Sequence, residues 1–338
     1  MNISVNFNLK NYNTLKLDNI AKYFVNLDKE NDIKDILFYF SKFGTSPTFF
    51  LGGGSNVLFS KDFEGLIIKN NIQGITQIED TADYAILEVG GGMKWDEFVR
   101  YTLQNNLYGL ENLALIPGTV GAAPVQNIGA YGIEQCDCFV ELRGYNFANN
   151  QFETYSYDDC HFGYRDSIFK NELKNTFIIT KVKYKLHKSF EPNLKYKDLQ
   201  NYIANNTIEL TAQNIYNAVC AIRKQKLPDP DIIPNAGSFF KNPIIEKQQF
   251  DDLINKFADL KYYVIDNNYY KIPAAYLIEK AGWKGKSIGQ AAVYANHSLI
   301  LINLGNAKSQ EILNLADEII KSIADLFNIR LEFEVNIL

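Results

Sequence analysis

The sequence predicts an α+β protein of two or three domains, and three observations support this. Segments with the two-residue alternation of strands are mixed with segments of helical period along the chain. A chain of 338 residues is long enough for two or three domains that each bury a core. Prolines between Lys226 and Pro230 indicate a linker to a C-terminal domain. We therefore expect a domain boundary near residue 228, and we consider the chain in three parts, residues 1–72, 73–227 and 228–328.

The first part is predicted to hold a strand near Ala21–Leu27 and a helix at about Asp32–Phe43. It then reaches Phe49-Phe-Leu-Gly-Gly-Gly-Ser-Asn-Val-Leu58, where two apolar runs flank a glycine turn. This pattern indicates a buried strand, a tight turn and a second strand. It is not a dinucleotide-binding fingerprint of the Rossmann type, because the glycine spacing differs and no helix follows.

The second part contains both strand and helix patterns, and it includes another glycine cluster, Gly90-Gly91-Gly92. A strand pattern precedes this cluster, and a helical pattern follows it. Thr211 precedes the apolar positions of the last predicted helix and is expected to cap it. The expected elements are strands at Ala85–Val89, Phe139–Tyr145 and Thr176–Tyr184, and helices at Trp95–Gln104 and Thr211–Lys224.

The third part is predicted to contain a helix near Pro273–Ala281, a strand at Ser298–Asn303 and a long amphipathic helix. We expect one face of that last helix to be buried in the core. The face consists of Ile312, Leu315, Ala316, Ile319, Ile323 and Leu326. The strict alternation from Arg330 to Ile337 predicts a closing strand.

Composition excludes several classes of function. The net charge is −5 and no basic run is present, so we expect no nucleic-acid partner. No apolar run approaches about 18 residues, and the first residues do not resemble a signal peptide, so we expect a cytoplasmic protein with no membrane segment. Cys136 and Cys138 lack a second pair with zinc-type spacing, which predicts reduced structural thiols and no metal site.

The most informative stretch runs from Ile116 to Gly132 and carries no charge. Glycines at 118, 121, 129 and 132 permit positive φ and let backbone N–H groups converge on a ligand, while Pro117 and Pro124 stiffen the loop. A diphosphate is the ligand that suits this loop, with Gln126 and Asn127 as side-chain donors. The alternative is a purely structural turn region. Two further glycine turns upstream favour one large phosphate-bearing ligand.

Three other segments carry chemistry, and each also has a plain structural interpretation. Arg165 in Phe162–Phe169 is a planar cation suited to a carboxylate or enolate, or else a solvated turn residue. Ser238 in Asn235–Pro243 could donate a proton, although no nucleophile-elbow motif surrounds it. Glu332 and Glu334 share one face of the expected closing strand, which could simply be exposed.

Together the glycine turns resemble the FAD-binding region of vanillyl-alcohol-oxidase (PCMH-type) flavoproteins. The central run resembles the signature of the UDP-N-acetylenolpyruvoylglucosamine reductases, also called UDP-N-acetylmuramate dehydrogenases. Further motifs similar to this family are NTLKLDNIAKYF from Asn13, GYRDSIFK, NAGSFFKNP and the closing LEFEV, so that the resemblance extends from Asn13 to Val335. It implies a two-lobed FAD-binding fold followed by an α+β substrate-binding domain. Residues 1–72 would form the first lobe, with residues 329–338 returning to it, residues 73–227 the second lobe, and residues 228–328 the substrate-binding domain.

The resemblance also implies roles for individual residues. Arg165 and Glu334 would polarise the substrate carboxylate, and Ser238 would protonate carbon. Tyr196 matches the tyrosine that closes over the diphosphate in the longer subtype of the family. The implied substrate-binding residues are Tyr164, Tyr196, Lys226, Asn242, Lys284 and His297. The implied cofactor-binding residues are Gly52, Gly53, Gly54, Ser55, Asn56, Pro117, Gly118, Gly121, Gln126, Asn127, Gly129, Tyr131 and Arg223.

The sequence departs from the family pattern at two places. Ala122-Ala123 stands where some members have serine, and His297 stands where glutamine also occurs. Neither departure removes a residue with an implied catalytic role.

The resemblance implies a monomeric flavoenzyme with non-covalent FAD that uses NADPH to reduce the enolpyruvyl ether of UDP-N-acetylglucosamine. The product, UDP-N-acetylmuramate, would serve peptidoglycan synthesis and through it cell shape and division. Two alternatives stay open: another FAD-dependent oxidase of the same superfamily, and a non-catalytic nucleotide-sugar binding protein. Rapid peroxide formation would indicate the first, and a colourless protein the second.

Overall fold

The computed structural model describes residues 2–44 and 47–338, and the chain forms two compact units. The first unit comprises Met1–Phe7, Ala21–Gly53 and Glu64–Gln225, and the second comprises Asn8–Ile20, Gly54–Phe63 and Lys226–Leu338. Both units are therefore built from separate stretches of chain. The finer division into residues 1–72, 73–227 and 228–328 stays a prediction.

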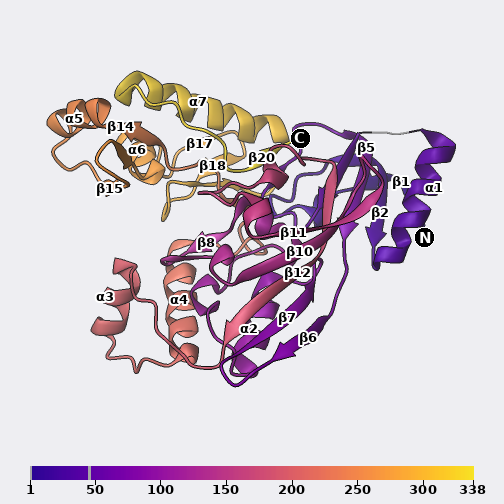
Figure 1. Cartoon of the computed structure of the whole chain (residues 1–338). Helices are drawn as coiled ribbons and strands as arrows, with labels where there is room; N and C mark the ends of the chain where they lie inside the picture. The colour runs from indigo at the N-terminus through magenta and orange to yellow at the C-terminus, as the bar shows by residue number, and fades with distance from the viewer. Residues whose placement is uncertain (1, 45–46) are drawn as a thin grey trace. The chain divides into compact units, whose positions relative to one another are not determined.

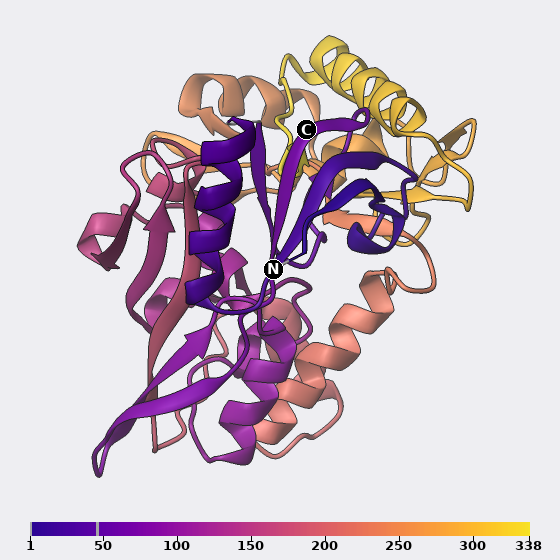
Figure 2. The ribbon, with the colours of Figure 1, turned by 90° about the vertical axis from the view of Figure 1, so that its right-hand side faces the viewer.

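The first unit contains a four-stranded sheet covered by one helix. The strand order is β1 (Ser4–Asn8), β2 (Ile20–Leu27), β5 (Phe63–Asn70) and β3 (Thr48–Leu51), with β3 parallel to β5. Helix α1 (Ile33–Phe43) lies alongside this sheet (Figure 2) and buries Ile33 and Ile36 against Val25, Leu66 and Ile68. In β5, the consecutive residues Leu66, Ile67 and Ile68 are all buried, so both faces of this strand are covered.

A five-stranded antiparallel sheet forms the larger part of the first unit (Figure 1). Its order is β11 (Gln151–Ser156), β10 (Phe139–Asn146), β12 (Phe177–His187), β7 (Tyr84–Gly90) and β6 (Ile75–Asp80). Helices α2 (Trp95–Gln104), α3 (Lys197–Asn205) and α4 (Ala212–Lys226) belong to the same unit. Trp95 and Phe98 of α2 pack their rings against Tyr184 of β12, so that the aromatic face of the helix is buried on the sheet.

The second unit is built on two small sheets and three helices. One sheet has the order β13 (Asn235–Ser238), β19 (Ile300–Asn303), β18 (Ala291–Val293) and β17 (Ser287–Ile288), and α7 (Ser309–Phe327) packs on it (Figure 1). The other has the order β14 (Ile244–Glu246), β16 (Tyr269–Lys271) and β15 (Tyr263–Val264), next to α5 (Lys247–Lys256). Helix α6 (Ala274–Lys280) contacts α7. The short β20 (Asn336–Ile337) pairs in parallel with β4 (Val57–Leu58).

Most predicted elements are confirmed within one to three residues. The helix at Trp95–Gln104 has the predicted bounds. The cap of α4 is also confirmed, because the Thr211 hydroxyl accepts the Asn214 N–H at 3.2 Å.

Two predictions about the C-terminal region are wrong. Leu326 is 36% exposed, and Phe327 occupies the buried position at the end of α7 instead. The closing strand is not continuous: residues 330–335 make only one isolated bridge, between Phe333 and Phe240, before β20. Burial does alternate along this segment, since Leu331 and Val335 are buried and Glu332 is exposed. The segment is therefore extended, but it does not form the continuous hydrogen-bond ladder of a strand. Among the described residues, no helix is long and apolar enough to span a membrane.

Candidate active site

The uncharged run from Ile116 to Gly132 folds as two turns of 3-10 helix followed by a hairpin. The turns are η4 (Val120–Ala122) and η5 (Pro124–Gln126), and the hairpin pairs β8 (Gly129–Ala130) with β9 (Ile133–Glu134). Tyr131 and Gly132 form the hairpin tip, with φ of 49° and 88°, as in a type I′ turn. We call Ile116–Gly132 the glycine run.

The other two glycine clusters lie directly against the glycine run. A Cβ on Gly53 would come within 2.8 Å of Gly118 Cα. Gly121 donates its N–H to Gly91 O at 2.8 Å, and a Cβ on Gly121 would also lie 2.8 Å from Ile179 O. Real Cβ atoms essentially never approach within 3.0 Å, so the backbone packing itself requires glycine here. The first unit thus brings the three glycine clusters together.

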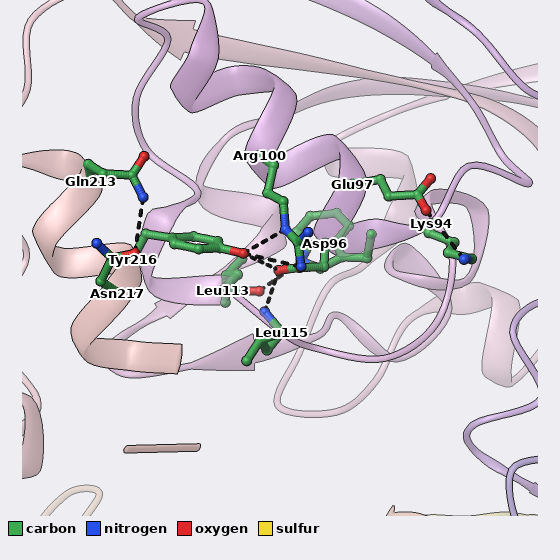
Figure 3. A network of polar contacts seen from close by, with 10 residues as sticks. Lys94, Asp96, Glu97, Arg100, Leu113, Leu115, Gln213, Tyr216 and Asn217 are labelled. Carbon is green, nitrogen blue, oxygen red and sulfur yellow. Dashed lines mark hydrogen bonds and ion pairs between the residues drawn. The ribbon is translucent and has the colours of Figure 1, made fainter. Parts of the chain in front are cut away.

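The start of the glycine run is held by a polar network between α2 and α4 (Figure 3). Asp96 accepts the Leu115 N–H at 2.6 Å, where Leu115 has a φ of 53°, a conformation that costs energy for a non-glycine residue. Arg100 lies 2.6 Å from the other Asp96 oxygen, and Tyr216 donates to the same carboxylate at 3.2 Å. Arg100 Nε also donates to the Tyr216 hydroxyl at 2.8 Å. The network therefore secures the chain just before Ile116.

Inside the glycine run, Asn127 supports the loop with its side chain. It is fully buried, and its amide donates to Glu134 Oε2 at 2.6 Å and to Gly163 O at 3.2 Å, while its oxygen accepts from Gln135. Both side-chain donors are thus committed within the unit. The Asn127 amide therefore has no N–H group left for the predicted hydrogen bond to a diphosphate in this geometry. Pro117, Gly118, Gln126, Gly129 and Tyr131 all retain some solvent exposure.

Arg165 reaches the glycine run from the segment after η7 (Asp158–Cys160). Its Nη2 donates to Gly129 O at 2.7 Å, and its guanidinium lies 5.3 Å from the centre of the Tyr164 ring. Ser167 donates to Val125 O at 2.7 Å, so the segment is tied to the glycine run at two places. Arg165 has a φ of 54°, which the tight turn between Gly163 and Asp166 imposes.

The segments that carry Ser238 and Glu334 pair through their backbones in the second unit. Ser238 ends β13 opposite Ile300, and the next residue, Phe239, accepts the Glu334 N–H at 2.9 Å. Asn56 donates its side-chain amide to Glu334 O at 3.2 Å. Phe239 and Phe240 pack against Phe333, which fixes the backbone that carries Ser238 and Glu334. Gly54 precedes this group and has a φ of 69°, and a Cβ there would overlap Tyr12 O.

A second group in the same unit carries positive charge. Burial lowers the pKa of His297, and the charges of Lys226 and Lys284 lower it further. His297 Nδ1 accepts the Leu299 N–H at 3.3 Å, and Lys284 pairs with Glu279 at 3.0 Å. Asn242 accepts the Ala274 N–H at the first turn of α6. The two lysine cations suit an anionic ligand such as a diphosphate, although Glu279 balances the charge of Lys284.

Comparison with known proteins decides the family. The profile of the UDP-N-acetylenolpyruvoylglucosamine reductase C-terminal domain matches residues 228–338, and that of an FAD-binding domain matches residues 21–149. The chain is 45% identical to the UDP-N-acetylenolpyruvoylglucosamine reductase of Flavobacterium johnsoniae over 100% of both proteins. It is 41% identical to that of Shewanella oneidensis over 99% of this chain and 97% of the relative. The chain belongs to the UDP-N-acetylenolpyruvoylglucosamine reductase family.

The fold prediction is confirmed by the same comparisons. The crystal structure of the reductase from Thermus caldophilus has a TM-score of 0.67 to this chain at 22% identity, covering 99% of this chain and 98% of that one. At this identity the likeness shows the fold alone. With the FAD-binding profile it establishes the predicted α+β, FAD-binding architecture and FAD as the cofactor.

The first unit of this reductase-family chain offers polar atoms that fit such a cofactor. Arg223 of α4 has its Nε shielded from solvent and without a hydrogen-bond partner among the described residues, and the Thr119 hydroxyl in the glycine run is in the same state. Burial lowers the pKa of Arg223, and the charge of the nearby Asp96 carboxylate partly offsets this effect. A buried cationic donor without a partner is costly unless an anion meets it. These two residues and the glycine run are suited to an anionic cofactor.

The structure places the predicted site residues in both units. The first holds Gly52, Gly53, Pro117–Tyr131, Tyr164, Arg165, Tyr196 and Arg223, and the second holds Gly54–Asn56, Lys226, Ser238, Asn242, Lys284, His297 and Glu334. Sequence patterns did not indicate Asp96, nor Asn112, whose buried amide donates to Tyr131 O in the glycine run at 2.8 Å. Asp96 carried a weak signal, because an acidic residue in the first turn of a helix is common for reasons unrelated to function.

Proposed function

We propose that this chain reduces the enolpyruvyl ether of UDP-N-acetylglucosamine to UDP-N-acetylmuramate, a step of peptidoglycan synthesis, with NADPH as the reductant. The main support for this proposal is the identity of 45% and 41%, over 99% or more of this chain, to two UDP-N-acetylenolpyruvoylglucosamine reductases. The backbone pairing of the segments that carry Ser238 and Glu334, which is supported by packed phenylalanine rings, is consistent with it. FAD, when bound, supplies two-electron transfer between NADPH and the substrate.

The roles of the chain's own residues follow from their chemistry. Arg165 is a permanent, planar cation and would balance the charge that develops on the substrate carboxylate as electrons arrive at the vinyl group. Glu334, if protonated, would donate a hydrogen bond to the same group. Ser238 would transfer its hydroxyl proton to the carbon next to the carboxylate, which completes the saturation of the double bond.

The remaining residues would bind and orient the substrate. Lys226 and Lys284 lie close enough to His297 for their charges to lower its pKa, and they would attract a diphosphate, while Asn242 lies at the start of α6 in the same unit. Tyr164 and Tyr196 present aromatic rings from the first unit. A cytoplasmic location and a monomeric state stay predictions.

Anaerobic visible absorbance of the purified protein tests the proposal. NADPH should bleach the flavin band, and the enolpyruvyl UDP-sugar should then restore it. Bleaching without recovery would show that the protein is a flavoprotein but would refute the proposed substrate. Recovery with oxygen alone, accompanied by rapid peroxide, would indicate an oxidase instead.

A further inference from the structure

One buried amide joins two segments that the proposed function assigns to different ligands. Asn112 lies in η3 (Glu111–Leu113) and is 1% exposed. Its Nδ2 donates to Tyr131 O at 2.8 Å and to Asn193 O at 2.9 Å. Tyr131 belongs to the glycine run, and Asn193 begins the short stretch that leads to Tyr196. One side chain therefore fixes the backbone of both.

The carbonyl that Asn112 holds belongs to a residue in a costly conformation. Tyr131 has a φ of 49°, and bulky residues rarely adopt positive φ without support from their surroundings. A hydrogen bond to its carbonyl from a buried, immobile donor restricts the turn that Tyr131 shares with Gly132. Asn112 thereby helps to hold the tip of the hairpin.

The stretch Asn193–Tyr196 is shaped to meet that tip. Asn193 Oδ1 accepts the Lys195 N–H at 3.1 Å, and its amide donates to Gly132 O at 3.4 Å. Tyr196 precedes α3, and its carbonyl accepts the N–H groups of Leu199 and Gln200. A Cβ on Gly132 would lie 3.3 Å from both Asn193 Oδ1 and Lys195 Cβ, so the two segments are in close contact.

The contact continues through the side chains. The rings of Tyr131 and Tyr196 meet edge to face with centroids 5.3 Å apart. Tyr131 also lies within electrostatic range of Arg223, whose Nε has no partner among the residues the structure describes. Any movement of the Tyr131 backbone would therefore shift the surface that Tyr196 packs on.

We infer that Asn112 is a positioning residue that couples Tyr196 to the glycine run, so that FAD binding orders the segment that contacts the UDP-sugar. This inference rests on the proposed function for the identity of the two ligands. It requires that each ligand strengthen the binding of the other, because coupling between sites is reciprocal.

A double-mutant cycle tests the coupling. Asn112→Ala removes both donors and should raise the dissociation constant of the enolpyruvyl UDP-sugar for the FAD-loaded protein about tenfold, which corresponds to about 1.4 kcal/mol. In a Tyr196→Ala background the same change should raise it less than about twofold, because the segment's contribution is already lost. An equal rise in both backgrounds would overturn the inference. Asn105→Ala is the matched control, since Asn105 makes one exposed amide bond to Tyr101 O at 2.8 Å.

A measurement on the unmodified chain avoids the risk that Asn112→Ala fails to fold. Adding FAD alone to apoprotein should slow amide hydrogen exchange both at residues 129–134 and at residues 193–200. Slowing confined to residues 129–134 would refute the coupling. The wild-type protein could show slowed exchange at both segments on adding FAD and yet fail to bind the UDP-sugar. That result would refute the proposed substrate but would still support the coupling of the two segments.

Discussion

Replacing Arg223 with methionine should change the stability of the apoprotein and the affinity for FAD in opposite directions. Methionine keeps an unbranched apolar stem and removes a cationic donor whose Nε is buried without a partner. A buried unsatisfied donor costs about 1–3 kcal/mol, so its removal should raise the free energy of unfolding of the apoprotein by about 1 kcal/mol. The unfolding midpoint should rise by about 1–2 °C.

The FAD-loaded protein should respond in the other way. A hydrogen bond to a charged partner contributes about 1.5–3 kcal/mol, so Arg223→Met should raise the dissociation constant of FAD by about 10- to 150-fold. Flavin fluorescence titration measures that constant, and thermal unfolding with and without FAD measures the two stabilities. The shift in midpoint on adding FAD should therefore shrink.

The same substitution at Arg100 is the control. Arg100 pairs with Asp96 at 2.6 Å and with Tyr216 at 2.8 Å, so Arg100→Met removes satisfied bonds and should lower the midpoint of the apoprotein slightly. The effect should be small because the Arg100 side chain is 56% exposed. If Arg223→Met destabilised the apoprotein and left FAD affinity unchanged, the assignment of Arg223 to the cofactor would be wrong.

Three further outcomes are expected. Ser238→Ala should keep reduction of the flavin by NADPH and lose most reoxidation by the enolpyruvyl UDP-sugar in stopped-flow absorbance; two intact half-reactions would exclude Ser238 as the proton donor. Tyr196→Phe should weaken binding of that sugar more than binding of FAD, and an unchanged affinity for the sugar would count against the role of Tyr196. His297→Gln should flatten the pH dependence of unfolding below the ordinary histidine pKa of 6.5, because burial lowers the pKa of His297 in the folded state and the unfolded chain then binds more protons as pH falls. The wild-type protein should lose at most about 1.4 kcal/mol per pH unit more than the variant, as measured by urea unfolding between pH 6.5 and 5.5.

Periodicity predicted most of the helices and strands, whereas the FAD-binding fold was implied by the family resemblance. The glycines of the run were expected to permit positive φ, and Gly118 and Gly132 do adopt it, with φ of 122° and 88°. Gly121 does not have positive φ and is required for another reason, because a Cβ there would clash with neighbouring backbone. Helical period predicted α2 and α7, since a buried stripe is a local property of the sequence. The family motifs pointed to Arg165, Ser238 and Glu334, and the structure groups the last two by backbone contacts.

What sequence could not reveal depends on distant partners. Alternation from Arg330 to Ile337 resembles a strand, but a strand requires a continuous neighbour, and only Phe240 bridges to Phe333. Asn112 carries no motif of its own. Its importance arises from two carbonyls, 19 and 81 residues away along the chain, that the fold brings to one amide. Periodicity predicts which face of one helix or strand is buried, but it does not predict hydrogen bonds between residues far apart in the sequence.

The interleaved composition of the second unit has a consequence for how the protein is made. Leu15, Leu17 and Leu58 lie in a core formed mostly by residues after 236, and Asn303 donates to Leu15 O across 288 residues. During synthesis these early apolar residues leave the ribosome long before their partners exist. Contacts of such sequence separation form slowly, and the waiting segment is open to aggregation. We therefore expect the nascent chain to depend on chaperones at residues 8–20 until the last helix and the pairing of β20 with β4 complete the unit.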